Sequence, residues 1–128
     1  MAFIKSKTLQ NGTTGTYWRI LQNNGNAQRK DKHIELALYL SKAQRLASPS
    51  DPLPYSVTFN FAPGDHPLSE LDPDSIDIAL IEDVDTLENH LVYQHIKAVA
   101  SLAAAKDEID RSANEHTALF FVDAQDDV

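Results

Sequence analysis

The spacing of apolar residues changes once along this chain of 128 residues, and the change limits which folds it can adopt. In the N-terminal half apolar side chains recur at every second position, most clearly from Ile34 to Leu40. A period of two places alternate side chains on opposite faces of a β-strand, one of them buried. From about Thr86 the period becomes helical, with a stripe through Leu87, Leu91 and Ala98. The pattern predicts an α+β fold, with one long C-terminal helix packed on a sheet formed by the N-terminal half.

Four strands are expected in residues 1–64. Two Asn-Gly pairs, Asn11-Gly12 and Asn24-Gly25, favour hairpin turns, and the first loop could run through Gly15. The predicted strands are Phe3–Gln10, Thr16–Gln22, Lys32–Leu40 and, after the proline-rich loop Ser48–Pro54, Tyr55–Phe61. Short connections between successive strands predict an antiparallel meander.

The C-terminal half is divided by composition into an acidic loop at 65–85, a helix at 86–113 and an extended acidic arm at 114–128. Within the loop, residues 76–84 are either a short fifth strand or irregular. Within the arm, Thr117–Val122 is apolar and would dock as a strand or as an extended segment. A chain of this length predicts a single domain over 1–128, with one core.

Charge is divided between the two halves. Residues 1–64 hold eight Lys/Arg and three acids, a net of +5, whereas residues 65–128 hold three Lys/Arg and sixteen acids, a net of −13. Opposite charges allow copies or partners to meet through different faces. Part of the opposition is expected to be neutralised inside the fold, where the helix packs on the sheet.

Motifs for catalysis and metal binding are missing from the sequence. There is no cysteine, no glycine-rich phosphate loop and no nucleophile elbow. His90 and His95 are five residues apart, which does not match the i, i+4 spacing of a helical zinc pair. The acidic run from Asp72 has Asp77 where a calcium loop needs glycine. The sequence therefore predicts no enzyme, no metal and no cofactor.

Nucleic acid and membranes are also not expected as partners. A sequence pI near 4.9 opposes binding to phosphate backbones. The basic cluster Arg29-Lys30-Asp31-Lys32 is interpreted as turn residues, although aromatic side chains lie on the neighbouring strand. No apolar run is long enough for a secretory signal or a membrane span.

Several short motifs occur along the chain: Leu9 followed by Asn11-Gly12, then Tyr17-Trp18-Arg19-Ile20, later Tyr93, Ile96 and Lys97, and the acidic ending Asp123–Val128. In these motifs the chain resembles small proteins encoded in the tail-gene region of tailed bacteriophages. The resemblance implies a non-enzymatic virion component of the tail tip or baseplate, made in the host cytoplasm. Its partners would be other virion proteins, with a homo-oligomer as one form of assembly.

Contact with such partners is predicted for two groups of residues. Tyr17 and Trp18 point to opposite faces of one strand, so at least one of them belongs to the core, and Phe120 and Phe121 are either core or interface. The predicted basic-side contacts are Tyr17, Trp18, Arg19, Arg29, Lys30 and Lys32, and those on the other side are Phe120, Phe121, Asp123, Asp126, Asp127 and Val128. The alternative function is a soluble acidic binding module, an inhibitor or adaptor that acts on a host protein.

Overall fold

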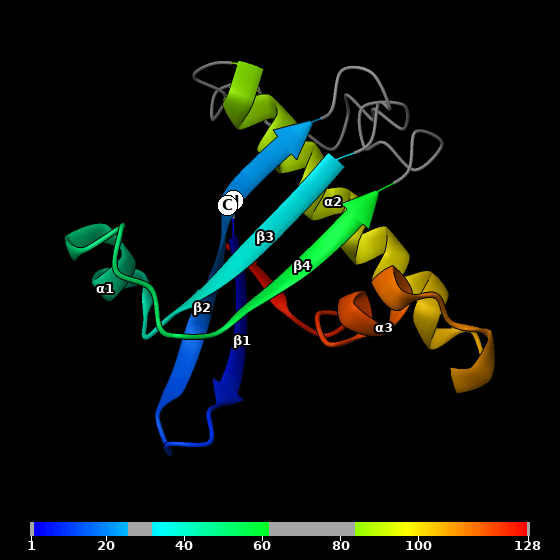
Figure 1. Cartoon of the computed structure of the whole chain (residues 1–128), viewed down its shortest axis with the longest axis horizontal. Helices are drawn as coiled ribbons and strands as arrows, with labels where there is room; N and C mark the ends of the chain where they lie inside the picture. The colour runs from blue at the N-terminus through cyan, green and yellow to red at the C-terminus, as the bar shows by residue number, and fades with distance from the viewer. Residues whose placement is uncertain (1, 26–31, 62–83, 128) are drawn as a thin grey trace.

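A computed structural model describes residues 2–25, 32–61 and 84–127. It contains a five-stranded antiparallel sheet in the order β4-β3-β2-β1-β5, accompanied by helices (Figure 1). This confirms the predicted α+β class. The elements are β1 (Ala2–Thr8), β2 (Thr14–Gly25), β3 (Lys32–Tyr39), α1 (Lys42–Ala47), β4 (Ser56–Phe61), α2 (Val84–Ala104), the 3₁₀ turn η5 (Glu108–Asp110), α3 (Ala113–Leu119) and β5 (Gln125–Asp127).

The first four strands form the predicted meander, but the second Asn-Gly pair is not a turn. Asn24 and Gly25 belong to β2 and pair with His33 and Lys32 of β3. Strand pairing therefore continues past the predicted turn, and the connection falls in residues 26–31, outside the described residues.

The first hairpin loop is longer than two residues, as expected, and Gly12 adopts the positive φ of 87°. Gly15 instead lies inside β2, where its backbone approaches β3 closely. A Cβ at position 15 would come within 2.6 Å of Leu38 Cγ and 2.8 Å of Leu53 Cδ1. Glycine at position 15 therefore leaves room for the Leu38 and Leu53 side chains and does not form part of the turn.

The C-terminal half differs most from the prediction. The expected helix at 86–113 is wrong beyond Ala104, where α2 ends. The chain then turns back through η5, and Ser112 starts α3 with a capping box, its hydroxyl accepting from the Glu115 amide while the Glu115 carboxylate accepts from the Ser112 amide. This reversal returns Ala118 and Phe121 to the sheet, where both are fully buried.

The extended arm predicted at 114–128 is likewise wrong for most of its length. The apolar segment Thr117–Val122 is the end of α3 followed by turns, because its buried residues reach the core from a helix and not from a strand. Only Gln125–Asp127 is extended, as β5. The alternative strand at 76–84 lies almost entirely outside the described residues.

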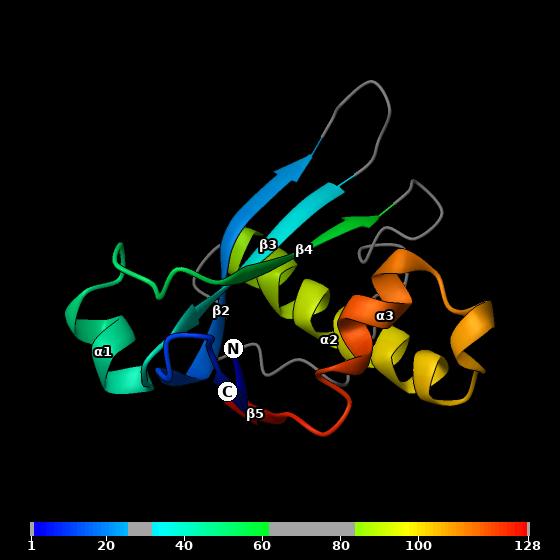
Figure 2. The ribbon, with the colours of Figure 1, turned by 60° about the horizontal axis from the view of Figure 1, so that its bottom comes forward.

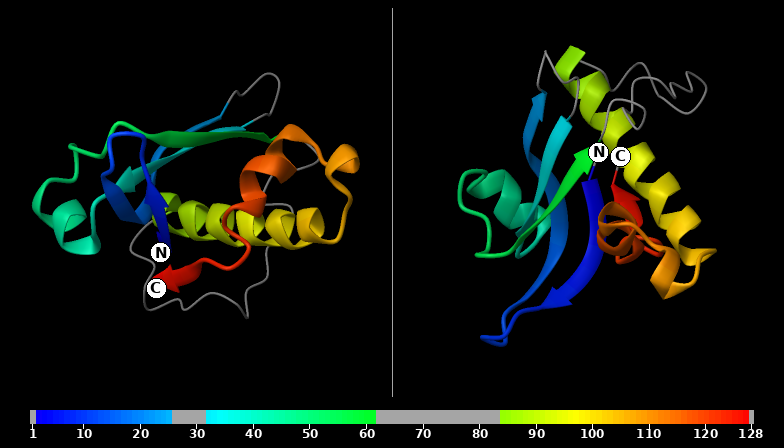
Figure 3. Two further views of the ribbon diagram at one scale, coloured as in Figure 1. Left: turned by 90° about the horizontal axis from the view of Figure 1, so that it is seen from below. Right: turned by 45° about the vertical axis from the view of Figure 1, so that its right-hand side comes forward.

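One face of the sheet carries the main core, beneath α2 and α3 (Figure 3). Buried side chains of β3 such as Ile34 and Leu36 pack there with Val92 and Ile96 of α2. α1 lies on the other side of the sheet (Figure 3), where a smaller cluster forms. That smaller cluster consists of Ala2, Tyr17, Ala37 and Tyr39.

Two register shifts of the β-bulge kind occur in the described strand pairs, and a buried aromatic side chain forms a hydrogen bond with the backbone beside each. In β1 the register shifts between Ile4 and Lys7, and the Trp18 indole donates to the Lys5 carbonyl at 2.9 Å. In β2 the register shifts between Ile20 and Gln22, and the amide of Ile20 donates to the Tyr93 hydroxyl of α2 at 2.6 Å. Burial raises the pKa of Tyr93, so the phenol stays protonated. A bulge leaves a strand group without its ladder partner, and the Trp18 indole bonds such a group, the Lys5 carbonyl, at the first bulge. The Tyr93 hydroxyl satisfies the Ile20 amide beside the second.

The substitution Tyr93→Phe tests the second bulge. It removes the acceptor but keeps the ring, so the Ile20 amide is left unsatisfied, and we expect a loss of about 1–3 kcal/mol in the free energy of unfolding. Urea denaturation of both proteins measures it. Tyr55→Phe is the matched control, because the Tyr55 hydroxyl makes no hydrogen bond to a described residue; equal losses in the two variants would contradict the role of Tyr93.

Candidate interaction surface

The two aromatic residues predicted as contacts are both core residues. Tyr17 is 4% exposed and Trp18 is 0% exposed, and they occupy the two different clusters on opposite faces of the sheet. Trp18 packs against Phe121 at 5.2 Å and Phe120 at 5.5 Å between ring centroids. The alternation argument was correct about their faces, but the prediction that these two side chains contact a partner is wrong, because the sheet is covered on both faces at this point.

The basic residues predicted as contacts do not form one described patch. Arg19 is half-buried in β2, and the Lys32 ammonium donates to the Asn23 side chain at 2.9 Å across the β2–β3 pair. Arg29, Lys30 and Val128 lie outside the described residues.

Phe120 and Phe121, which were predicted as either core or interface, differ in burial. Phe121 is 0% exposed and lies 5.1 Å from the Phe3 ring, so it is core. Phe120 is half-buried, with the Lys5 ammonium 5.0 Å from its ring centroid. It therefore lies where the core meets the surface.

The C-terminal segment Asp123–Asp127 docks on the first strand. β5 pairs antiparallel with β1, from Ala2 opposite Asp127 to Ile4 opposite Gln125, so the two ends of the chain lie side by side (Figure 2). The Lys97 ammonium of α2 donates to the carbonyl oxygens of Phe121 and Ala124, at 3.2 and 2.6 Å. Strand pairing and the helix thus hold this segment from two sides.

Charges of the N-terminal half also hold the segment. Lys5 pairs with Asp123, and Lys42 pairs with Asp127 at 2.9 Å. The Tyr17 hydroxyl donates to the same Asp127 carboxylate at 2.8 Å. Asp126 is exposed and has no ion pair with a described residue. The opposition between the two halves is therefore partly neutralised within the molecule.

These contacts change the acidity of the groups involved. The hydrogen bond from Lys42 holds the pKa of Asp127 below its ordinary value, and Lys5 does the same for the pKa of Asp123. Burial and the neighbouring Asp127 raise the pKa of Tyr17. The ionised form of each carboxylate is thus the one that the fold stabilises.

Asp127→Asn tests the docking of β5. The variant loses the charge that attracts Lys42, so we expect roughly two- to fivefold faster hydrogen exchange at the amides shared by β5 and β1, a range typical of exposed ion pairs. Exchange measured by NMR gives the rates. Asp126→Asn is the control, because it removes the same charge one residue earlier without an ion pair; equal acceleration by both variants would contradict the pairing with Lys42.

The same pair predicts a pH dependence. A folded-state pKa below the ordinary value of about 3.9 means that the unfolded chain binds the proton more readily, so this stabilisation is complete above that value and is lost as the pH falls further. The difference in unfolding free energy between the wild type and Asp127→Asn should therefore shrink between pH 6 and pH 2. Urea denaturation at a series of pH values measures it, and a constant or growing difference would be the opposite result.

The sheet has two unlike edges. On β4, the Asn114 side chain of α3 binds the amide and the carbonyl of Asn60, at 3.1 and 2.8 Å. Since these groups face away from β3, strand alternation turns the backbone of Ser56 and Thr58 outward as well. On the opposite side, β1 continues through Lys5–Thr8 beyond its last pair with β5. Among the described residues, no further strand pairs with the outward backbone groups of Ser56 and Thr58 or with β1 beyond Ile4.

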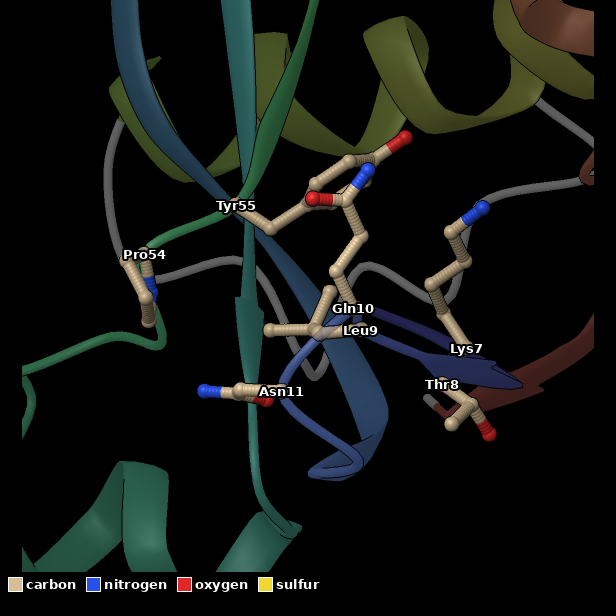
Figure 4. Close-up of a pocket in the computed structure, with 7 residues that line it drawn as sticks. All are labelled: Lys7, Thr8, Leu9, Gln10, Asn11, Pro54 and Tyr55. Atoms are coloured by element: carbon tan, nitrogen blue, oxygen red, sulfur yellow. The ribbon is translucent and has the colours of Figure 1, made fainter.

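A shallow groove lies beside the β1–β2 hairpin. One part has a volume of about 520 Å³, and Figure 4 shows Lys7, Gln10 and Tyr55 extending their side chains toward the same side of it. An adjoining part of about 360 Å³ shares Lys7 and Tyr55 and reaches His116 and Phe120. The residues bordering the first part are Lys7, Thr8, Leu9, Gln10, Asn11, Pro54 and Tyr55.

The groove combines aromatic rings with a cation. The Lys7 ammonium lies 5.4 Å from the Tyr55 ring centroid and 5.9 Å from that of Phe120. Unlike Lys5, Lys7 has no carboxylate partner among the described residues. Such a surface suits a ligand that carries an apolar group next to a carboxylate. The sequence could not reveal it, because Tyr55 and Phe120 are 65 positions apart.

Within residues 2–25, 32–61 and 84–127, no three potential metal ligands cluster, and no helix is both long and apolar enough to cross a membrane. Comparison with known proteins gives no match to a protein-family model, a curated protein or a solved structure. The candidate interaction surface consists of the two sheet edges and the groove.

Proposed function

We propose that this protein is a non-enzymatic structural subunit of a tailed-phage virion, at the tail tip or baseplate, and that it acts by assembly with other virion proteins and with copies of itself. The resemblance in residues 9–20 supports the phage assignment. The proposal places the protein in the virion after synthesis in the host cytoplasm, with neither nucleic acid nor membrane as a partner.

The observation that carries the assembly role is the pair of unlike edges on one sheet, each with backbone groups that pair with no further strand of the described residues. Strands add to such edges through backbone hydrogen bonds. When the two edges differ, the edge of one subunit meets a different edge of the next, and repeated contacts of this kind form rings or filaments. β4 and the part of β1 beyond Ile4 lie at opposite edges of the described sheet, as this mode of assembly requires.

The alternative, an acidic inhibitor or adaptor acting on a host protein, gains less support. Two of the three carboxylates in the C-terminal segment are in ion pairs with Lys5 and Lys42. Recognition of a basic cleft through this segment would first have to break those pairs.

Virion composition tests the proposal. Purified virions of the phage that encodes the chain should contain it in a fixed ratio to another tail protein, as measured by quantitative mass spectrometry. Its absence from virions would refute the proposed structural role and favour the alternative, an inhibitor or adaptor that acts on a host protein.

The same preparation tests the β4 edge. Thr58→Pro removes an amide that faces away from β3, so the sheet should survive while addition of a strand is blocked. We expect Thr58→Pro to fold, by circular dichroism, but to be lost from virions, whereas the control Thr58→Ala is retained. Incorporation of both variants at the wild-type level would exclude the β4 edge as a contact.

A further inference from the structure

The loop between α2 and α3 contains an acidic turn, Asp107–Asp110, and the residues on either side of this turn are held by hydrogen bonds and an ion pair. The Arg111 guanidinium donates to the carbonyl oxygens of Ala103 and Lys106, at 2.7 and 2.9 Å. The Lys106 ammonium in turn pairs with Glu115 of α3 at 2.8 Å. These contacts tie the loop to both neighbouring helices, so the acidic turn is preorganised.

The acidic turn presents an isoleucine to solvent. Ile109 is 90% exposed, the most exposed large apolar side chain among the described residues. Its neighbours Asp107, Glu108 and Asp110 are exposed acids without ion pairs to described residues. The acidic turn therefore offers one branched apolar group surrounded by carboxylates, on a rigid support.

The groove beside the hairpin has the complementary features. Its aromatic side chains, Tyr55 and Phe120, provide an apolar surface, and Lys7 supplies a cation without a carboxylate partner in the described structure. His116 lies at the same rim. An apolar group flanked by carboxylates matches this surface in its apolar character and is opposite to it in charge.

We propose that the acidic turn of one copy binds in the groove of a second copy, with Ile109 against Tyr55 and Phe120 and its acidic neighbours near Lys7. The contact cannot be within one molecule in this fold, because the acidic turn lies beyond the end of α2, away from the β1–β2 hairpin (Figure 1), and its isoleucine is exposed.

Each copy carries one acidic turn and one groove, and the two surfaces differ. A contact between unlike surfaces leaves one surface of each kind unused at the ends of the complex, so further copies can add. The inference rests on the proposed function in one respect, that copies of the chain associate, and it names the surfaces by which they do so.

Four variants of the full chain, one of them a control, test the contact by sedimentation at low salt. Ile109→Asp removes the apolar group and Lys7→Glu reverses the cation, and we expect each to weaken self-association at least tenfold. Leu46→Asp is the control, because Leu46 is 69% exposed on α1, outside both surfaces, and it should associate like the wild type. Glu108→Lys reverses one charge of the acidic turn and should also weaken self-association. Circular dichroism checks that all four variants fold.

A mixing experiment identifies the pairing directly. Lys7→Glu keeps an intact acidic turn and Ile109→Asp keeps an intact groove, so an equimolar mixture should form a discrete 1:1 complex that does not grow. The proposal would be overturned if the mixture stayed monomeric or if the wild type were monomeric at millimolar concentration. It would also be overturned if Ile109→Asp and Lys7→Glu each associated as strongly as the wild type. Since the assay uses purified protein, association without presence in virions would refute the proposed function and leave this contact standing.

Discussion

The hydrogen bonds that Trp18 and Tyr93 make to the backbone are the interactions on which the sheet depends. Bulges bend a strand and increase its twist, and here they occur in β1 and β2. These two neighbouring strands contribute Phe3 and Trp18 to the main core, which also contains residues of α2 and α3. The Lys5 carbonyl and the Ile20 amide lie beside these bulges, and each forms a hydrogen bond with the polar atom of a buried ring. The same rings fill the main core, so the shape of the sheet and its apolar packing are specified together.

Local patterns explain why the strands could be predicted and the C-terminal half could not. Strict alternation identified β3 and β4 because one face of each strand packs into the main core. The short helices α1 and α3 span six and seven residues, too few for a helical period to show. Their capping residues were nevertheless visible, since Ser41 precedes Gln44 and Ser112 precedes Glu115 by three positions, a spacing typical of helix starts.

The candidate interaction surface was harder to predict because it depends on contacts between distant parts of the chain. Lys5 and Asp123 are separated by 118 positions, and Tyr17 and Asp127 by 110. The division of charge between the halves indicated that such pairs would form, but it could not say which acids they would use. Some opposite charges are therefore neutralised inside the molecule, while Lys7 and the acidic turn keep theirs exposed.

The pairing of β5 with β1 also has a consequence for the order of folding. It joins residues 2–4 to residues 125–127, so nearly the whole chain forms the intervening loop. Contacts of such high contact order form late, after the local hairpins of the meander have reduced the entropy of closure. A three-residue strand at the edge is also the element that opens most readily in the native state. Each opening lengthens the free edge of β1, so the number of backbone groups offered to another strand varies with the local stability of β5.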